Sequence, residues 1–188
     1  MFGVCDGREG RDKKYAYMGF VKVMMVGGLL FAAVVGRGQA LPPAPPAPAK
    51  VLPVFRFERY DHRLLTNADL PKGKLMLFVF FDPDCEHCQR TVRRMDEQYA
   101  SFHAVAVYFV SMASQDKIDW FASTYAPRLF AQKNVLFLRD PGAGYMLGFH
   151  PTRFPSLFLY SQGNKLLDYE DNEETLFRIE RSIAAFGK

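Results

Sequence analysis

The residues of this chain that are best suited to chemistry are two cysteines separated by two residues, Cys85 and Cys88. A thiolate at the first cysteine can attack a disulfide. The second thiol, one helical turn further on, can then attack the mixed disulfide and release the substrate. The pair follows an apolar run and precedes a helical pattern. The first thiol is therefore expected at a helix N-terminus, which favours its ionised form.

Two ionisable residues, Glu86 and His87, separate the cysteines. A protonated imidazole at His87 can stabilise a thiolate at Cys85, whereas the negative charge of Glu86 opposes it. A better stabilised thiolate makes the pair more oxidising. These two residues are therefore predicted to tune the redox potential, in a direction that the sequence leaves open.

A Cys-x-x-Cys (CXXC) pair has two other uses, as half of a zinc site and as a structural disulfide. The sequence has no second pair, so zinc would need ligands from carboxylates or from His62, His103 or His150. The third cysteine, Cys5, lies near the N-terminus. The strand–CXXC–helix context favours a redox-active pair, and we expect no bound metal.

The composition is that of a globular protein, with 49% hydrophobic and 23% charged residues. The formal net charge is +4, of which residues 1–40 carry +3 from six basic and three acidic side chains, leaving +1 for residues 41–188. A body this close to neutral has no nucleic-acid-binding character. Three cysteines are also too few for a disulfide scaffold.

The first forty residues have the pattern of an export signal. Residues 23–36 form an uncharged apolar run of fourteen residues, Lys22 precedes it and Gly38-Gln39-Ala40 follows it. The run is shorter than the roughly 20 residues of a spanning helix and suits a signal peptide cleaved after Ala40. An uncleaved N-terminal membrane anchor is the alternative, and a start at Met18 would give the signal its usual proportions. Six prolines in residues 41–53 then predict an extended Pro-rich linker.

Residues 54–188 alternate between strand and helix patterns, which predicts one domain. This alternation implies an α/β fold with a mixed central β-sheet flanked by helices on both faces. The last helix begins after Asn172 and is expected to bury Leu176, Ile179, Ile183 and Phe186. The other expected elements are strands over residues 75–81, 104–110, 135–138, 156–160 and 165–169, and helices from the cysteines to residue 102 and over 115–125.

Together these features resemble the thioredoxin-like superfamily, and most closely its exported thiol–disulfide oxidoreductases of the TlpA/ResA type. The resemblance rests on LMLFVFF, on DPDCEHC at a helix start, and on Phe154-Pro155 ahead of a β-hairpin and a final helix. It implies the thioredoxin fold, with Cys85 as the attacking thiol and Cys88 as the buried resolving thiol. Pro155 would be the cis-proline beside the disulfide, and the Phe154 backbone would pair with a bound substrate segment. The cysteine pair itself would be the redox-active group, with no further cofactor.

Members of this superfamily carry an acidic residue that helps the buried cysteine to lose its proton. This chain lacks an acid at the corresponding positions. Val79 stands where thioredoxins carry that acid, and Thr91 stands where some TlpA-like proteins carry another. The resemblance therefore leaves Asp82, Asp84 and Glu86 as candidate proton acceptors. Asp84 also replaces a tryptophan on the surface that meets the partner.

The resulting hypothesis is an extracytoplasmic thiol–disulfide oxidoreductase that acts on protein dithiols and disulfides. We expect it in the periplasm or otherwise exported, free or tethered to the inner membrane, with a membrane partner for electron transfer. The main alternative is a thioredoxin-fold module that binds a metal or a partner, its cysteines being ligands or a structural bridge. A peroxide-reducing enzyme is a further alternative, but it would need a reactive cysteine in a loop of its own.

Overall fold

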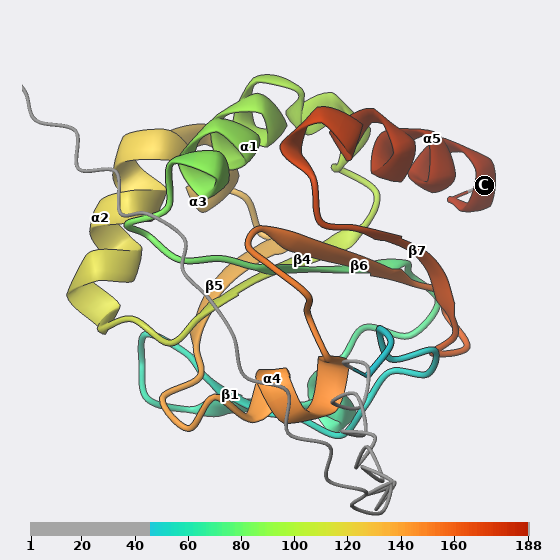
Figure 1. Cartoon of the computed structure of the whole chain (residues 1–188), viewed down its shortest axis with the longest axis horizontal. Helices are drawn as coiled ribbons and strands as arrows, with labels where there is room; N and C mark the ends of the chain where they lie inside the picture. The colour runs from blue at the N-terminus through green and yellow to red at the C-terminus, as the bar shows by residue number, and fades with distance from the viewer. Residues whose placement is uncertain (1–45, 188) are drawn as a thin grey trace, which may run out of the picture. The chain divides into compact units, whose positions relative to one another are not determined.

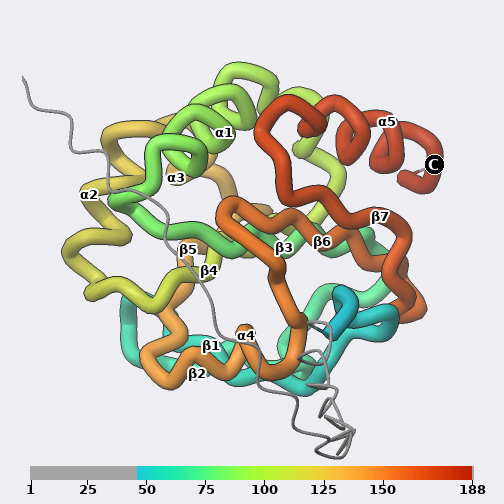
Figure 2. The backbone as a smooth tube through the Cα atoms, in the orientation of Figure 1, coloured from blue at the N-terminus to red at the C-terminus, as the bar shows by residue number. Residues whose placement is uncertain are grey.

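The computed structural model describes residues 46–187, which are built around a seven-stranded β-sheet. The strands follow the order β2-β1-β5-β4-β3-β6-β7 across the sheet. Figure 2 shows β3 near the middle of this sheet, with the chain crossing over between neighbouring strands. The strand bounds are β1 Arg56–Glu58, β2 Leu64–Thr66, β3 Met76–Phe80, β4 Ala106–Ser111, β5 Val135–Arg139, β6 Ser156–Tyr160 and β7 Leu166–Glu170.

The sheet is mixed, as the sequence predicts. Strand β4 runs parallel to both β3 and β5, whereas β6 runs antiparallel to β3 and to β7. Strands β1 and β2 form an antiparallel pair, and β1 joins β5 through Glu58 and Arg139. The parallel pairs need crossovers, which the helices supply, while the closing hairpin needs only a short turn.

Helices cover both faces of the sheet, so the expected architecture is confirmed (Figure 1). Helices α1, α2, α3 and α5 lie on one face and the short α4 on the other. The bounds are α1 Glu86–Glu97, α2 Gln115–Tyr125, α3 Pro127–Phe130, α4 Gly144–Phe149 and α5 Leu176–Phe186, with 3-10 turns η1 Asn67–Asp69, η2 Tyr99–Ser101 and η3 Glu173–Thr175.

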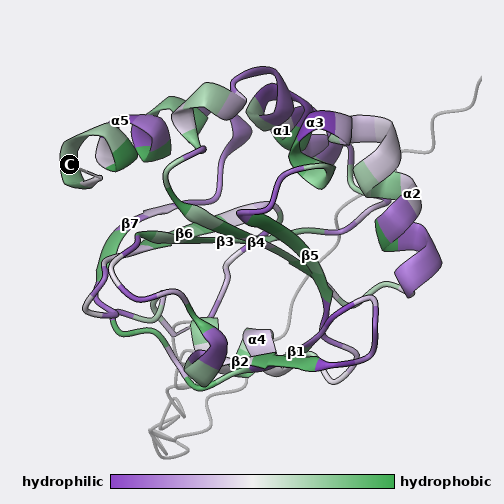
Figure 3. Cartoon of the chain, turned by 180° about the vertical axis from the view of Figure 1, so that it is seen from behind, coloured by the Kyte–Doolittle hydropathy of each residue, from purple (hydrophilic) through white to green (hydrophobic). Residues whose placement is uncertain are grey.

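Strand β3 is apolar throughout because both of its faces are buried. Leu77 and Val79 pack in a core cluster with the inner faces of α1, α2 and α5. Phe78 and Phe80 point the other way, into a cluster that contains Phe149 of α4. The hydropathy colouring of Figure 3 shows the resulting apolar band through the central strands. The two clusters hold the end of β3, and therefore the cysteines that follow it, in a fixed place.

Several expected boundaries differ in the structure. Helix α1 ends at Glu97, and the expected apolar period continues through η2 to the buried Phe102. Phe186 was expected on the buried face of the last helix, but its side chain is 52% exposed because the helix ends at that residue. The sequence did not predict α3, α4 or β2, since elements of three to six residues are too short to show a period.

The segment predicted to be a free linker is packed onto the domain over its described part. The Ala49 N–H donates to the Phe149 carbonyl at 3.0 Å, and Lys50 accepts from the Leu166 N–H at 2.9 Å. The side chain of Leu52 is buried. The folded domain therefore begins before residue 54. The predicted leader lies outside the described residues, and no helix within residues 46–187 is both long and apolar enough to cross a membrane.

Candidate active site

The two cysteines lie just after the end of β3, at the N-terminus of α1. After Phe81 the chain turns through Asp82, whose carbonyl accepts from the Cys85 N–H at 3.1 Å and whose carboxylate accepts from the Asp84 N–H at 2.9 Å. Cys85 is the N-cap residue of the twelve-residue helix α1, and its side chain makes no capping hydrogen bond to the first turn. The turn thus places the first thiol as the sequence predicts.

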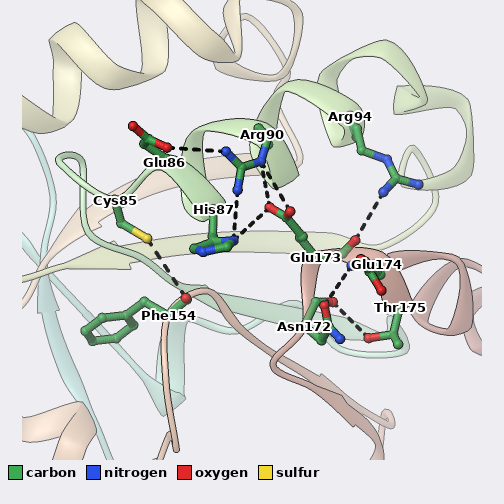
Figure 4. Close-up of polar contacts among 10 residues, drawn as sticks. All are labelled: Cys85, Glu86, His87, Arg90, Arg94, Phe154, Asn172, Glu173, Glu174 and Thr175. Carbon is green, nitrogen blue, oxygen red and sulfur yellow. Dashed lines mark hydrogen bonds and ion pairs between the residues drawn. The ribbon is translucent and has the colours of Figure 1, made fainter.

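Cys85 is partly exposed, and its sulfur lies 4.0 Å from the carbonyl oxygen of Phe154 (Figure 4). Phe154 precedes Pro155, and the peptide bond between them is cis. The structure therefore brings together a thiol and a loop that are 69 residues apart in the chain.

Cys88 is fully buried in the core cluster that contains Val92 and Met95 of the same helix. Both cysteines are free thiols in this structure. Burial raises the pKa of the Cys88 thiol far above its ordinary value, and the charges of Cys85 and Asp82 act in the same direction, while a hydrogen bond from the Asp82 backbone opposes them. Cys88 is therefore held protonated until a base removes its proton.

The two intervening residues make ion pairs and hydrogen bonds with Arg90 and Glu173. His87 Nδ1 lies 3.2 Å from Glu173 Oε2 and 2.9 Å from Arg90 Nη2, and Glu86 pairs with Arg90 at 3.6 Å (Figure 4). Arg90 also pairs with Glu173 at 3.0 Å. These contacts tie the start of α1 to η3, which lies near the other end of the domain sequence. The effect of His87 on the Cys85 thiolate stays a prediction.

Glu173 is a member of the site that the sequence did not reveal. The hydrogen bonds from Arg90 lower the pKa of the Glu173 carboxyl below its ordinary value, and His87 lowers it further, against a smaller opposing effect of burial. The sequence showed Glu173 only as an acid in the first turn of an expected helix. Its partners are more than 80 residues away, so no local pattern could identify them.

The three candidate proton acceptors have different surroundings. Glu86 is 84% exposed beside Arg90, and Asp84 pairs with Lys117 of α2 at 2.5 Å. The charge of Asp82 acts directly on the buried Cys88. Val79 and Thr91, at the two positions where an acid was expected from the resemblance, are both buried.

A cavity of about 410 Å³ opens between the turn that carries Asp82 and the start of α2, and it is lined by Asp84, which precedes Cys85 in the chain, rather than by Cys85 itself. Phe154 forms part of its wall, and the buried Tyr145 of α4 forms another part. The Tyr145 hydroxyl has no hydrogen-bond partner among the described residues, and burial raises its pKa. No local sequence pattern predicts this cavity, because its lining comes from segments far apart in the chain.

The loop before β6 is fastened by a cluster of hydroxyl groups around Tyr169 of β7. The Tyr169 hydroxyl accepts from the Thr152 N–H at 3.1 Å and contacts the Thr152 hydroxyl at 2.7 Å and the Ser156 hydroxyl at 3.1 Å. Asp171 accepts from Thr152 and pairs with Arg153 at 3.3 Å. This cluster holds both sides of the Phe154–Pro155 step and so fixes the carbonyl that faces Cys85.

The cysteine pair could also form half of a metal site. Within residues 46–187 no group of three or more histidine, cysteine, aspartate or glutamate side chains is arranged to hold a metal ion. The three histidines proposed as additional ligands have other contacts: His62 pairs with Glu58, His103 with the Ala100 carbonyl, and His150 with the Ala47 carbonyl.

Comparisons with known proteins give one family and one fold. The sequence pattern of the AhpC/TSA family matches residues 47–152, which is more than half of the chain. No curated protein matches the sequence of this chain. Among solved structures, dsbF of MTB has a TM-score of 0.59 and 20% identity, over 75% of this chain and 99% of that chain.

Two further solved structures agree. The thioredoxin domain of a thiol-disulfide oxidoreductase from Bacteroides vulgatus has a TM-score of 0.59 and 17% identity, over 73% of this chain and 97% of that chain. An uncharacterized thioredoxin-like protein from Porphyromonas gingivalis has a TM-score of 0.56 and 18% identity, over 73% of this chain and 94% of that chain. These likenesses confirm the thioredoxin fold that the sequence predicts.

Proposed function

Because the chain belongs to the AhpC/TSA family, we propose that it is a thiol–disulfide oxidoreductase that exchanges disulfides with protein partners through Cys85 and Cys88. One observation carries the proposal. A partly exposed thiol at the start of α1 lies 4.0 Å from the Phe154 carbonyl, and a buried thiol follows one turn further on. Two structural relatives, dsbF and the thioredoxin domain of a thiol-disulfide oxidoreductase, support the same activity.

The exchange proceeds in two steps. The Cys85 thiolate attacks one sulfur of the substrate disulfide, a Cys85–substrate disulfide forms, and the other substrate sulfur leaves as a thiolate. Cys88 then loses its proton and attacks the Cys85 sulfur, so the second substrate thiolate leaves and a Cys85–Cys88 disulfide remains. Two electrons pass from the protein to the substrate. The same steps in reverse oxidise a substrate dithiol.

The surrounding residues serve these steps. The Phe154 backbone, next to Pro155, pairs with the substrate segment. Because the Phe154 carbonyl faces Cys85, a segment paired there lies next to the Cys85 sulfur. Asp82 takes the proton of Cys88, since it is the candidate carboxylate whose charge acts on that thiol. Glu86 and His87 tune the potential indirectly, through the ion pairs they make with Arg90 and Glu173.

The export pattern of residues 1–40 supports a periplasmic or otherwise exported location, with or without an inner-membrane anchor. Electrons would then be exchanged with a membrane partner. The reduction potential of the cysteine pair decides the direction: about −270 mV would make the protein a reductant and about −120 mV an oxidant.

The test is reduction of insulin disulfides by dithiothreitol, with the wild type, Cys85→Ser and Cys88→Ser compared. We expect the wild type to accelerate the reduction of insulin at least about tenfold over dithiothreitol alone, and we expect Cys85→Ser to give no acceleration. Cys88→Ser should instead accumulate a mixed disulfide with the substrate, visible by non-reducing electrophoresis. A wild type that is inactive and carries stoichiometric zinc or copper would replace this proposal with a metal-binding module.

A further inference from the structure

The cavity between the Asp82 turn and the start of α2 lies in the path of a bound substrate. Phe154 contributes both to the cavity wall and to the carbonyl that faces the Cys85 sulfur. A substrate polypeptide joined to Cys85 and lying along Phe154 therefore passes the mouth of the cavity. The side chain next to the substrate cysteine is the group within reach. This inference rests on the proposed disulfide exchange.

The charges that line the cavity favour a cation. Asp82 and Asp84 supply two negative charges, and Lys117 supplies one positive charge. Lys117 Nζ lies 2.5 Å from Asp84 Oδ2, and the two side chains are 54% and 68% exposed. The ion pair is thus open to solvent and can be rearranged by a guest. The cavity keeps a net charge of −1, centred on Asp82.

The remaining walls suit a long side chain with an apolar stem. Apart from Ser111 and Ser114, the other lining residues are apolar or aromatic: Phe81, Met112, Ala113, Tyr145 and Phe154. The Tyr145 hydroxyl is buried and has no hydrogen-bond partner in the described part of the chain, and because its oxygen is shielded from solvent it offers a guest no polar contact. Lysine and arginine combine an apolar stem with a charged end that only donates hydrogen bonds.

We propose that this cavity receives a lysine or arginine side chain adjacent to the reactive cysteine of the protein substrate, with Asp82 and Asp84 attracting its charge. The protein would therefore prefer substrates whose cysteine lies in a basic segment. Lys117 moderates the preference, because it neutralises one of the two carboxylates.

The experiment uses three short peptides that differ only in the residues flanking one cysteine: lysine, glutamine or glutamate. Each cysteine carries thionitrobenzoate as a mixed disulfide. Reduced protein attacks the peptide sulfur through Cys85, coloured thionitrobenzoate leaves, and Cys88 then displaces the peptide thiol. Each protein molecule reacts once, because the exchange leaves a Cys85–Cys88 disulfide. The readout is therefore the second-order rate constant of thionitrobenzoate release for each peptide, and the ratio of the lysine to the glutamate peptide reports the preference.

Two variants break the same ion pair but change the charge in opposite directions. We expect the wild-type ratio to be about threefold or more, Asp84→Asn to lower it about threefold, and Lys117→Gln to raise it by a similar factor. Added salt should bring every ratio towards one. Asp116→Asn removes an exposed acid next to Lys117 that does not line the cavity, and it should change the ratio much less.

The outcomes separate the two proposals. If all peptides react at one rate, or if both variants shift the ratio in the same direction, the cavity does not select a cation and the inference is overturned. A preference for the glutamate peptide overturns it as well. If the wild type reacts with no peptide and also fails to reduce insulin, the proposed function itself fails.

Discussion

The first turn of α1 meets a charged surface at Cys85, whereas one turn further on the same helix reaches the apolar interior at Cys88. Around Cys85 the neighbouring side chains form ion pairs, His87 with Glu173 and Asp84 with Lys117. Around Cys88 the neighbours are core side chains such as Val92 and Met95. A separation of two residues is enough to leave Cys85 partly exposed at the edge of this core cluster and to bury Cys88 completely within it.

This contrast explains how two residues of one type can have different roles. The helix N-terminus favours ionisation of an exposed thiol, and burial opposes ionisation of the other. The difference depends on the rotation of the helix, because the N-cap position faces outwards and the position one turn on faces the sheet. The predictions below test first the interior, then the contrast itself, and last the charged surface.

The largest effect is expected in the interior. Phe109 of β4 is fully buried in the cluster that contains Cys88 and stacks on Phe137 with ring centroids 4.6 Å apart. We expect Phe109→Ala to lower the free energy of unfolding by about 3–5 kcal/mol, because the lost contacts leave a cavity. Urea unfolding measures this. Phe186→Ala, at a side chain that is 52% exposed, is the matched control and should cost less than about 1 kcal/mol; equal losses would contradict the assigned interior.

The contrast between the two thiols should appear in their alkylation rates. We expect iodoacetamide at neutral pH to modify Cys85 at least about 100-fold faster than Cys88, because burial raises the pKa of Cys88 and blocks access to it. Peptide mapping by mass spectrometry measures each rate. The same protein unfolded in guanidinium provides the control, and there the two rates should converge. Similar rates in the folded protein would remove the basis for assigning different roles.

The smallest effect is expected at the charged surface. Hydrogen bonds from Arg90 hold the pKa of Glu173 below its ordinary value of 4.5. A lowered pKa in the folded state stabilises the protein above pH 4.5, and this stabilisation is lost as the pH falls through the lowered pKa. We expect Glu173→Gln to cost less than about 1 kcal/mol at pH 7, with the difference from wild type vanishing in acid.

Urea unfolding over a series of pH values tests this dependence. Glu174→Gln is the control, since Glu174 forms no ion pair among residues 46–187. A difference between Glu173→Gln and the wild type that stays constant down to acidic pH would show that the carboxylate charge is not its source.

The sequence predicted much of the site because the relevant signals are local. The apolar run of β3, the turn through Asp82 and the cysteine spacing lie within a few residues of one another, so they specify the strand, the helix start and the position of Cys85. Helix α2 matches the expected residues 115–125 for the same reason. The contacts of His87 were not predictable, because its partner Glu173 is brought to it only by the packing of the C-terminal segment.

The sequence by itself determined the pattern of strands and helices, the presence of a CXXC pair at a helix start and the absence of an acid at positions 79 and 91. These follow from hydrophobic period and residue type, which act over one or two turns. Only the tertiary structure decided that residues 47–52 pack on the domain, that the Phe154 carbonyl faces Cys85, and that Asp82, Asp84 and Tyr145 share a cavity. Those features depend on contacts between segments far apart in the chain, and their geometry arises only when the two core clusters are packed.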